Sequence, residues 1–142
     1  MEQLSSAEVS LRRLMQVWAA LFLFGGLYFL LLPDRLLRDL NVTGELFGLG
    51  AIEIQAGLGS EEFWRILAVA MMFTIATASW ITARDVRHNR AAVIPIVVSK
   101  LTSSSLGLAY FALSGTGAFL SIFLADFPIA LLTLYVYRRA AR

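Results

Sequence analysis

Four long apolar stretches dominate the pattern of hydrophobic and polar positions along the chain. They cover residues 14–32, 63–83, 91–113 and 118–137, while charged residues gather between them. A helix needs about 20 apolar residues to cross a hydrocarbon layer ~30 Å thick, and each stretch meets that length. The pattern therefore predicts an all-α fold, an integral membrane four-helix bundle formed by one domain over residues 1–142.

The connections between the stretches differ in kind. Residues 34–62 form the one sizeable loop, and residues 34–40 carry apolar and charged side chains at helical spacing, which predicts a short amphipathic helix lying flat on the membrane. The rest of this loop is glycine-rich yet apolar, so we expect it to pack on the bundle or on a partner. Only residues 114–117 separate the last two stretches. This short connection predicts that spans three and four form a tight antiparallel hairpin.

The arginines predict how the spans are oriented. Eight of the eleven arginines occur before the first stretch, between the second and third, and after the fourth: Arg12, Arg13, Arg84, Arg87, Arg90, Arg138, Arg139 and Arg142, whereas the loop of residues 34–62 carries more acidic than basic residues. All three regions lie on one side of a four-span protein, and the positive-inside rule makes that side cytoplasmic. We therefore expect a multi-pass protein of a bacterial inner membrane with both termini in the cytoplasm.

The composition excludes several kinds of site. The chain has no cysteine, and its single histidine, His88, lies in a charged loop, so no cofactor and no metal site is expected. Membrane topology accounts for the net charge of +2, so we expect the lipid bilayer as a partner and no nucleic acid. Trp18 lies near the end of a stretch and is expected to anchor it at the interface.

Lys100 is the only lysine of the chain and falls inside the third stretch. An ionised group at that depth costs about 2.5–3.5 kcal/mol on insertion scales, so it normally has a partner. Asp126 is the only carboxylate inside any stretch. At 1.5 Å per residue, Lys100 lies roughly 13 Å and Asp126 roughly 16 Å from the same membrane face. The two side chains are predicted to pair across the hairpin.

Small and polar residues extend the face of Lys100. With Asp126 they make a candidate intramembrane polar site of Lys100, Asp126, Ser99, Ser103, Ser104 and Tyr110. Three interpretations stay open. The pair fixes the packing of spans three and four, or it forms a pocket for a polar headgroup, a quinone or a proton. In the third, one charge faces outward and binds a partner subunit.

Three segments carry a resemblance to a known family. Residues 62–76, residues 99–113 and the segment around Asp126, residues 126–137, resemble small four-helix inner-membrane proteins of bacteria of the DoxX-like type. The resemblance implies an inner-membrane four-helix bundle, and in some relatives an association with redox or quinone-linked systems. It carries no catalytic residue over to this chain.

Together these observations predict an accessory or anchoring subunit of a larger inner-membrane complex, which binds other membrane subunits or associates with itself. The alternative is a small transporter or a lipid- or quinone-binding protein that uses Lys100 and Asp126. An enzyme is not expected, because Ser103 one turn from Lys100 lacks a nucleophile elbow and an oxyanion site.

Overall fold

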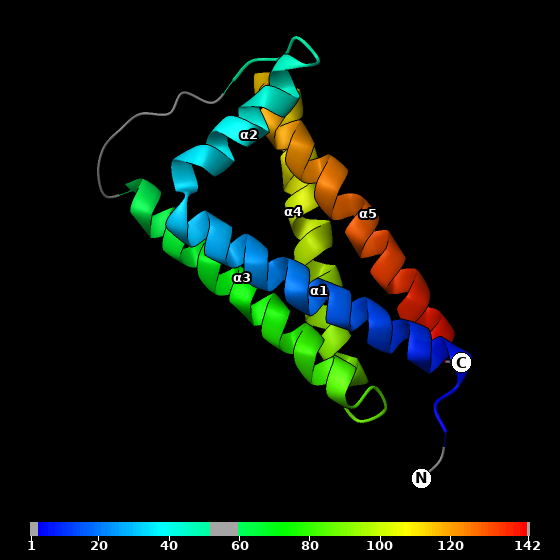
Figure 1. Ribbon diagram of the computed structural model, residues 1–142. Helices are drawn as coiled ribbons and strands as arrows, with labels where there is room; N and C mark the ends of the chain where they lie inside the picture. The colour runs from blue at the N-terminus through cyan, green and yellow to red at the C-terminus, as the bar shows by residue number, and fades with distance from the viewer. Residues whose placement is uncertain (1–2, 52–59, 142) are drawn as a thin grey trace.

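The computed structural model describes residues 3–51 and 60–141, and within them it is helical almost throughout (Figure 1). The elements in chain order are α1 (Ser6–Leu31), α2 (Pro33–Glu45), α3 (Ser60–Arg84), the short 3₁₀ helix η1 (Arg90–Ala92), α4 (Val93–Ser114) and α5 (Gly117–Ala140). The long helices α1, α3, α4 and α5 are apolar enough to cross a membrane. The predicted all-α bundle with four spans is confirmed.

The first helix begins eight residues before the predicted start of the first stretch. Ser5 caps it, because its hydroxyl accepts a hydrogen bond from the Glu8 amide at 3.2 Å while the Glu8 carboxylate accepts one from the Ser5 amide at 2.8 Å. This reciprocal arrangement is a capping box, which stabilises a helix start regardless of hydropathy. The apolar pattern did not indicate these additional turns, because the charged residues of the first two turns interrupt it.

The amphipathic helix expected at residues 34–40 is present as α2 and extends to Glu45. It begins with Pro33, and at the first position of a helix the missing N–H of proline costs nothing. The side chains of Leu36, Leu37 and Leu40 are partly buried, whereas the charged residues between them are exposed. The rest of the predicted loop is described only as far as residue 51, and residues 52–59 lie outside the described part of the chain.

The four long helices form two close pairs, α1 with α3 and α4 with α5 (Figure 1). A glycine brings each pair together. A Cβ on Gly26 of α1 would lie 2.8 Å from the ring of Phe73 on α3, and a Cβ on Gly107 of α4 would lie 2.9 Å from the carbonyl oxygen of Phe119 on α5. Gly115, with a φ of 67°, ends α4 and lets the chain reverse. The predicted hairpin of spans three and four is confirmed.

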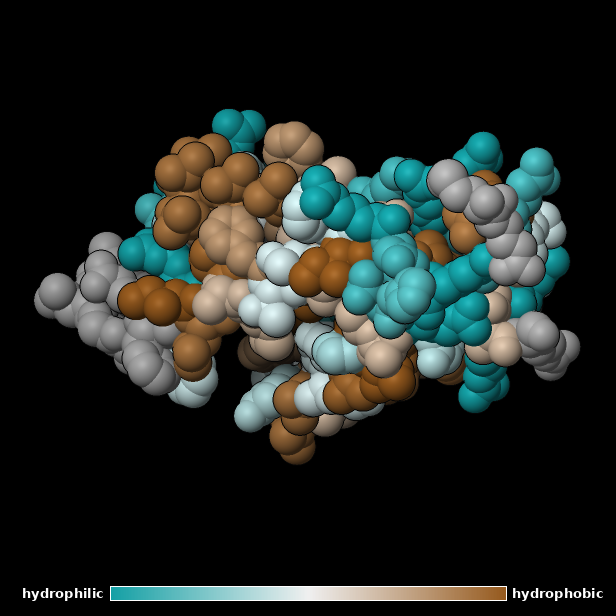
Figure 2. All heavy atoms as spheres, turned by 90° about the horizontal axis from the view of Figure 1, so that it is seen from below, coloured by the Kyte–Doolittle hydropathy of each residue, from teal (hydrophilic) through white to brown (hydrophobic). Residues whose placement is uncertain are grey.

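The hydrophobic core lies toward one end of the bundle, which we call the arginine-rich end. This end contains the start of α1, the turn at residues 85–89 and the end of α5, and hydrophilic side chains gather there (Figure 2). The core residues that pack together are Leu11, Met15, Trp18, Phe22, Ile75, Ala76, Ala83, Val86, Val93, Ile96, Val97 and Ala140. The two pairs are therefore joined mainly over the half of the bundle nearest that end.

At the opposite end α2 connects the two pairs (Figure 1). It starts directly after α1, and its other end contacts the α4–α5 turn, where Gly44 packs against Gly117 and the Gly117 amide donates a hydrogen bond to the Gly50 carbonyl at 2.9 Å. Thirteen helical residues span about 20 Å, whereas packed helices lie only about 8–10 Å apart. The two pairs therefore diverge toward this end, and α2 covers the distance between them.

Candidate functional site

The candidate polar site lies where the two pairs are still in contact. On α4 the buried residues Lys100, Ser104 and Gly107 follow one another at helical spacing along a single face. Asp126 comes from the returning helix α5, at the level of Lys100, because the turn between the helices is tight. The hairpin geometry alone thus brings the two charged side chains together.

The carboxylate of Asp126 is bound at both oxygens by α4. The Lys100 Nζ lies 2.9 Å from Asp126 Oδ1, and the Ser103 hydroxyl donates a hydrogen bond to Asp126 Oδ2. Ser103 Oγ also lies 3.3 Å from the Lys100 carbonyl, but its single proton serves one acceptor at a time. The Lys100 and Asp126 side chains are only 10% and 14% exposed. The charges therefore face the interior of the bundle and each other.

Phe22 of α1 completes the surroundings of the ammonium group. Lys100 Nζ lies 4.5 Å from the centroid of the Phe22 ring, within the range of a cation–π interaction. This contact links α1 to the α4–α5 pair at the level of the ion pair. Phe22 could not be predicted from the sequence, since a phenylalanine inside an apolar stretch carries no signal of its own.

A second contact between the pairs lies one turn closer to the arginine-rich end. The Trp18 Nε1–H donates a hydrogen bond to Thr133 Oγ1 at 2.9 Å, joining α1 to α5, and Trp18 is only 8% exposed. The expectation that Trp18 anchors α1 at a lipid interface is therefore wrong. Its indole is buried because Thr133 provides the acceptor that a buried N–H requires.

The remaining predicted site residues stand apart from this cluster. Ser99 is half-buried, and no hydrogen bond within the described residues joins its side chain to Asp126 or Lys100. Ser104 is buried, but its hydroxyl donates to the carbonyl of Leu101 in its own helix at 3.0 Å. Tyr110 is 54% exposed and packs against Phe119 with ring centroids 5.5 Å apart and ring planes tilted by 32°. The structure thus brings together Lys100, Ser103 and Asp126 only.

A separate charged cluster at the arginine-rich end connects α1 to the segment that follows α3. The buried Glu8 of α1 accepts hydrogen bonds from the Arg87 guanidinium at 2.9 and 3.1 Å, and Arg90 lies 3.6 Å from the same carboxylate. In the exposed turn, Oδ2 of Asp85 lies 2.7 Å from Nδ1 of His88. The pKa of Asp85 is held below its ordinary value, chiefly because the His88 backbone N–H donates a hydrogen bond to the carboxylate.

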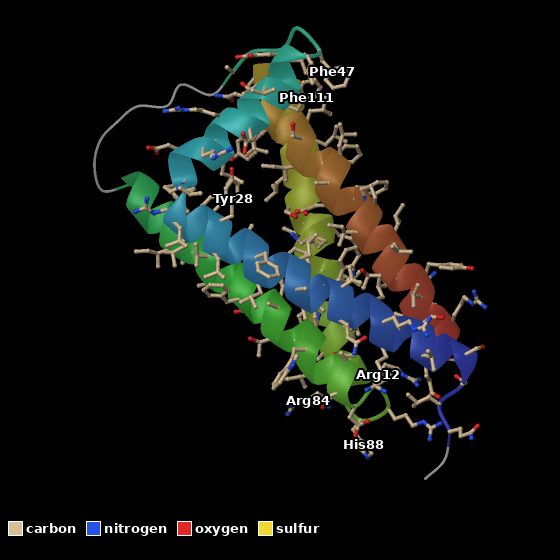
Figure 3. The ribbon with its side chains drawn as sticks, in the orientation of Figure 1. Arg12, Tyr28, Phe47, Arg84, His88 and Phe111 are labelled. Carbon is tan, nitrogen blue, oxygen red and sulfur yellow. The ribbon has the colours of Figure 1, made fainter. Side chains whose placement is uncertain are left out.

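One further polar contact lies at the opposite end. The Tyr28 hydroxyl on α1 donates a hydrogen bond to Asp39 of α2 at 2.6 Å (Figure 3). Within residues 3–51 and 60–141, no three His, Asp or Glu side chains gather closely enough to hold a metal ion. The charged groups described above are engaged with one another and stabilise the packing of the helices.

The fold and these contacts define the chain as an all-α bundle with the architecture of a multi-pass membrane protein. Comparison with models of protein families, with curated proteins and with solved structures finds no match.

Proposed function

We propose that this chain is a membrane-embedded accessory or anchoring subunit of a larger assembly in a bacterial cytoplasmic membrane, with no catalytic chemistry of its own. The arginine-rich end faces the cytoplasm in this proposal, as the positive-inside rule expects. The observation that carries it is an apolar surface at the opposite end, which we call the tip and which consists of Leu46, Phe47 and Leu113.

The tip consists of apolar side chains that are exposed over most of their surface. Leu46, Phe47 and Leu113 are 79%, 66% and 84% exposed. The neighbouring helix α2 exposes charged residues, so this level of the molecule lies at the boundary between lipid and water rather than in the hydrocarbon. Burial of apolar side chains there by a partner contributes roughly 25 cal/mol of favourable binding free energy for each Å² removed from water. An apolar surface that is exposed at a polar boundary is typical of an interaction site.

The tip is also held in place, which favours recognition. Gly48, with a φ of 65°, turns the chain back, and the contacts of Gly44 and Gly50 with the α4–α5 turn hold the segment on the bundle. A fixed surface loses little conformational entropy when a partner binds.

The polar cluster supports the same proposal. Lys100 and Ser103 bind the two oxygens of Asp126, and Phe22 covers the ammonium, so the cluster fits a role in joining the two helix pairs. An anchoring subunit requires helix pairs that are joined in this way.

The test is the mass of the native particle after gentle detergent extraction from its own host, with identification of whatever co-purifies. We expect a stoichiometric foreign membrane subunit, and we expect the variant Leu46→Ser/Phe47→Ser to accumulate normally but to lose it. Val42→Ser, on α2 and 52% exposed, is the matched control and should retain the partner. A wild-type particle that contains only this chain contradicts the proposal.

A second function is favoured by one observation. The Lys100 and Asp126 side chains keep 10% and 14% of their surface exposed, and a lysine ammonium has three protons to donate. A small transporter or a lipid- or quinone-binding protein would use this pair. Under that function Asp126→Asn abolishes pH-dependent transport or ligand binding while the protein still accumulates. Loss of accumulation without any ligand binding by the wild type rejects it.

A further inference from the structure

A groove runs along the outside of the α1–α3 pair, away from the polar cluster. Its volume is about 460 Å³. Small side chains line much of it, among them Ala20, Ala76 and Thr77, together with the larger Leu23 and Trp80. Most of these residues are exposed, so the groove opens toward the surroundings of the bundle and not into the core.

Two arginines continue the groove at the arginine-rich end. Arg12 lies one turn before Gln16, which lines the groove, and Arg84 lies one turn after Trp80, so each falls on the helix face that forms the groove. Both are exposed, and Figure 3 shows them toward the same end of the α1–α3 pair. Within the described residues neither guanidinium is paired with a carboxylate, in contrast to Arg87 and Arg90.

The guanidinium of Arg84 is oriented by an aromatic ring. Its Cζ lies 4.0 Å from the centroid of the Trp80 ring. Stacking on a ring face leaves the N–H groups at the edge of the guanidinium free to donate. Such an edge matches the oxygens of a phosphate, which arginine binds with two parallel hydrogen bonds.

The groove together with the two arginines at its end matches the length of one leaflet of a bilayer. From Arg12 to Leu23, eleven residues of α1 rise roughly 16 Å. Half of a ~30 Å hydrocarbon layer is about the same distance. An apolar groove that is one leaflet long when the cations at its headgroup end are included is complementary in length and charge to an anionic phospholipid. A spanning helix of a partner would need a groove about twice as long.

We propose that this groove binds an anionic phospholipid of the adjacent leaflet, with an acyl chain along the α1–α3 surface and the phosphate between Arg12 and Arg84. Basic pockets at the membrane-facing ends of helices recognise anionic headgroups in this way. The proposal depends on the four spans lying in a bilayer and not on an accessory role, so each can fail without the other.

The test is native mass spectrometry of the protein released from nanodiscs that contain equal amounts of phosphatidylglycerol and phosphatidylethanolamine. We expect the wild type to retain phosphatidylglycerol selectively. Each arginine near an anionic surface is worth about fivefold in affinity, so Arg12→Gln/Arg84→Gln should reduce that retention by roughly 25-fold.

The control removes the same charge from the same end. Arg138→Gln/Arg139→Gln alters two exposed arginines of α5 that do not line the groove, and it should retain the lipid. A second variant, Ala20→Phe, keeps both arginines and fills the groove at an exposed position, so it should also lose the lipid. The proposal is overturned if the arginine variant retains phosphatidylglycerol like the wild type, if both arginine pairs lower retention equally, or if Ala20→Phe has no effect.

Discussion

Gly44 at the end of α2 and Gly117 at the start of α5 meet backbone to backbone. A Cβ built on Gly44 would lie 3.0 Å from the Cα of Gly117, and one built on Gly117 would clash with Gly44 outright. This contact holds α2 across the end of the bundle where the two helix pairs diverge. Among the glycines that the structure describes, Gly117 is the one at which an added Cβ would come closest to another atom.

Gly117→Ala is therefore expected to destabilise the protein by about 1–3 kcal/mol, because neither backbone can move away without displacing α2. The measurement is thermal unfolding in detergent. Gly25→Ala is the matched control, since the atom closest to its added Cβ is Met72 Sδ at 4.0 Å. The control should be neutral or slightly stabilising, because alanine favours a helix over glycine. Equal melting temperatures for both variants would contradict the close contact.

Breaking the Lys100–Asp126 pair on one side should be much more harmful than replacing both partners. Lys100→Met or Asp126→Leu alone leaves an uncompensated buried charge and is expected to cost about 3–5 kcal/mol. The double variant Lys100→Met/Asp126→Leu should recover most of that loss. Unfolding of the four proteins in a double-mutant cycle measures the coupling, and additive losses would show that the two groups do not depend on each other.

A charge reversal separates a packing role from a role in binding. If Lys100→Asp/Asp126→Lys restores the stability and accumulation that each single change removes, the pair serves the packing of α4 on α5. Single variants that accumulate normally but lose a measurable activity would contradict that role.

Trp18→Phe removes the hydrogen bond to Thr133 while keeping a ring in the core. We expect a loss of about 1 kcal/mol, since Thr133 still donates to the Ile129 carbonyl at 2.6 Å and is not left without a partner. Trp80→Phe is the control, because Trp80 is half exposed and the phenylalanine would still offer a ring face to the Arg84 guanidinium. If the control loses as much stability as Trp18→Phe, the hydrogen bond contributes nothing.

Glu8→Gln removes the charge that two arginines share at the arginine-rich end. Arg87 and Arg90 would then lose the carboxylate that both contact, and the melting temperature should fall, because hydrogen bonds to a charged group are stronger than those between neutral groups. Glu45→Gln, at an exposed position on α2, serves as the control and should change stability by less than about 0.5 kcal/mol. The measurement is the melting temperature of the two variants in the same detergent, and equal values would contradict the role of Glu8.

The features that sequence reasoning predicted depend on local patterns. Apolar length predicted the four long helices, and helical spacing predicted the start of α2. The pairing of Lys100 with Asp126 followed from helix rise, because a short turn makes the second helix run back antiparallel beside the first. Glu8 could have been found in the same way, since Ser5 and Glu8 carry the spacing of a capping box.

The contacts that sequence reasoning missed join helices far apart in the chain. Trp18 and Thr133 are 115 positions apart, and hydropathy does not say which face of an apolar helix meets another protein helix and which meets lipid. For the same reason Phe22 was not predicted as part of the site. Tyr110 shares the helical spacing of Lys100 but lies outside the cluster of Lys100, Ser103 and Asp126. Rotation of each helix about its axis is set by tertiary packing, which a uniformly apolar sequence does not reveal.

The division of the bundle into α1 with α3 and α4 with α5 has a consequence for its biogenesis. Each pair consists of consecutive spans, so the first can leave the translocon as a finished hairpin while the second is still being synthesised. Lys100 and Asp126 both belong to the second pair, so we expect them to enter the lipid together with their charges already paired. What remains for the end of synthesis is the docking of two preformed hairpins through Trp18, Phe22 and Glu8, followed by closure of α2 over Gly117. We expect the halves of a chain cut within residues 85–89 to recombine when they are produced together.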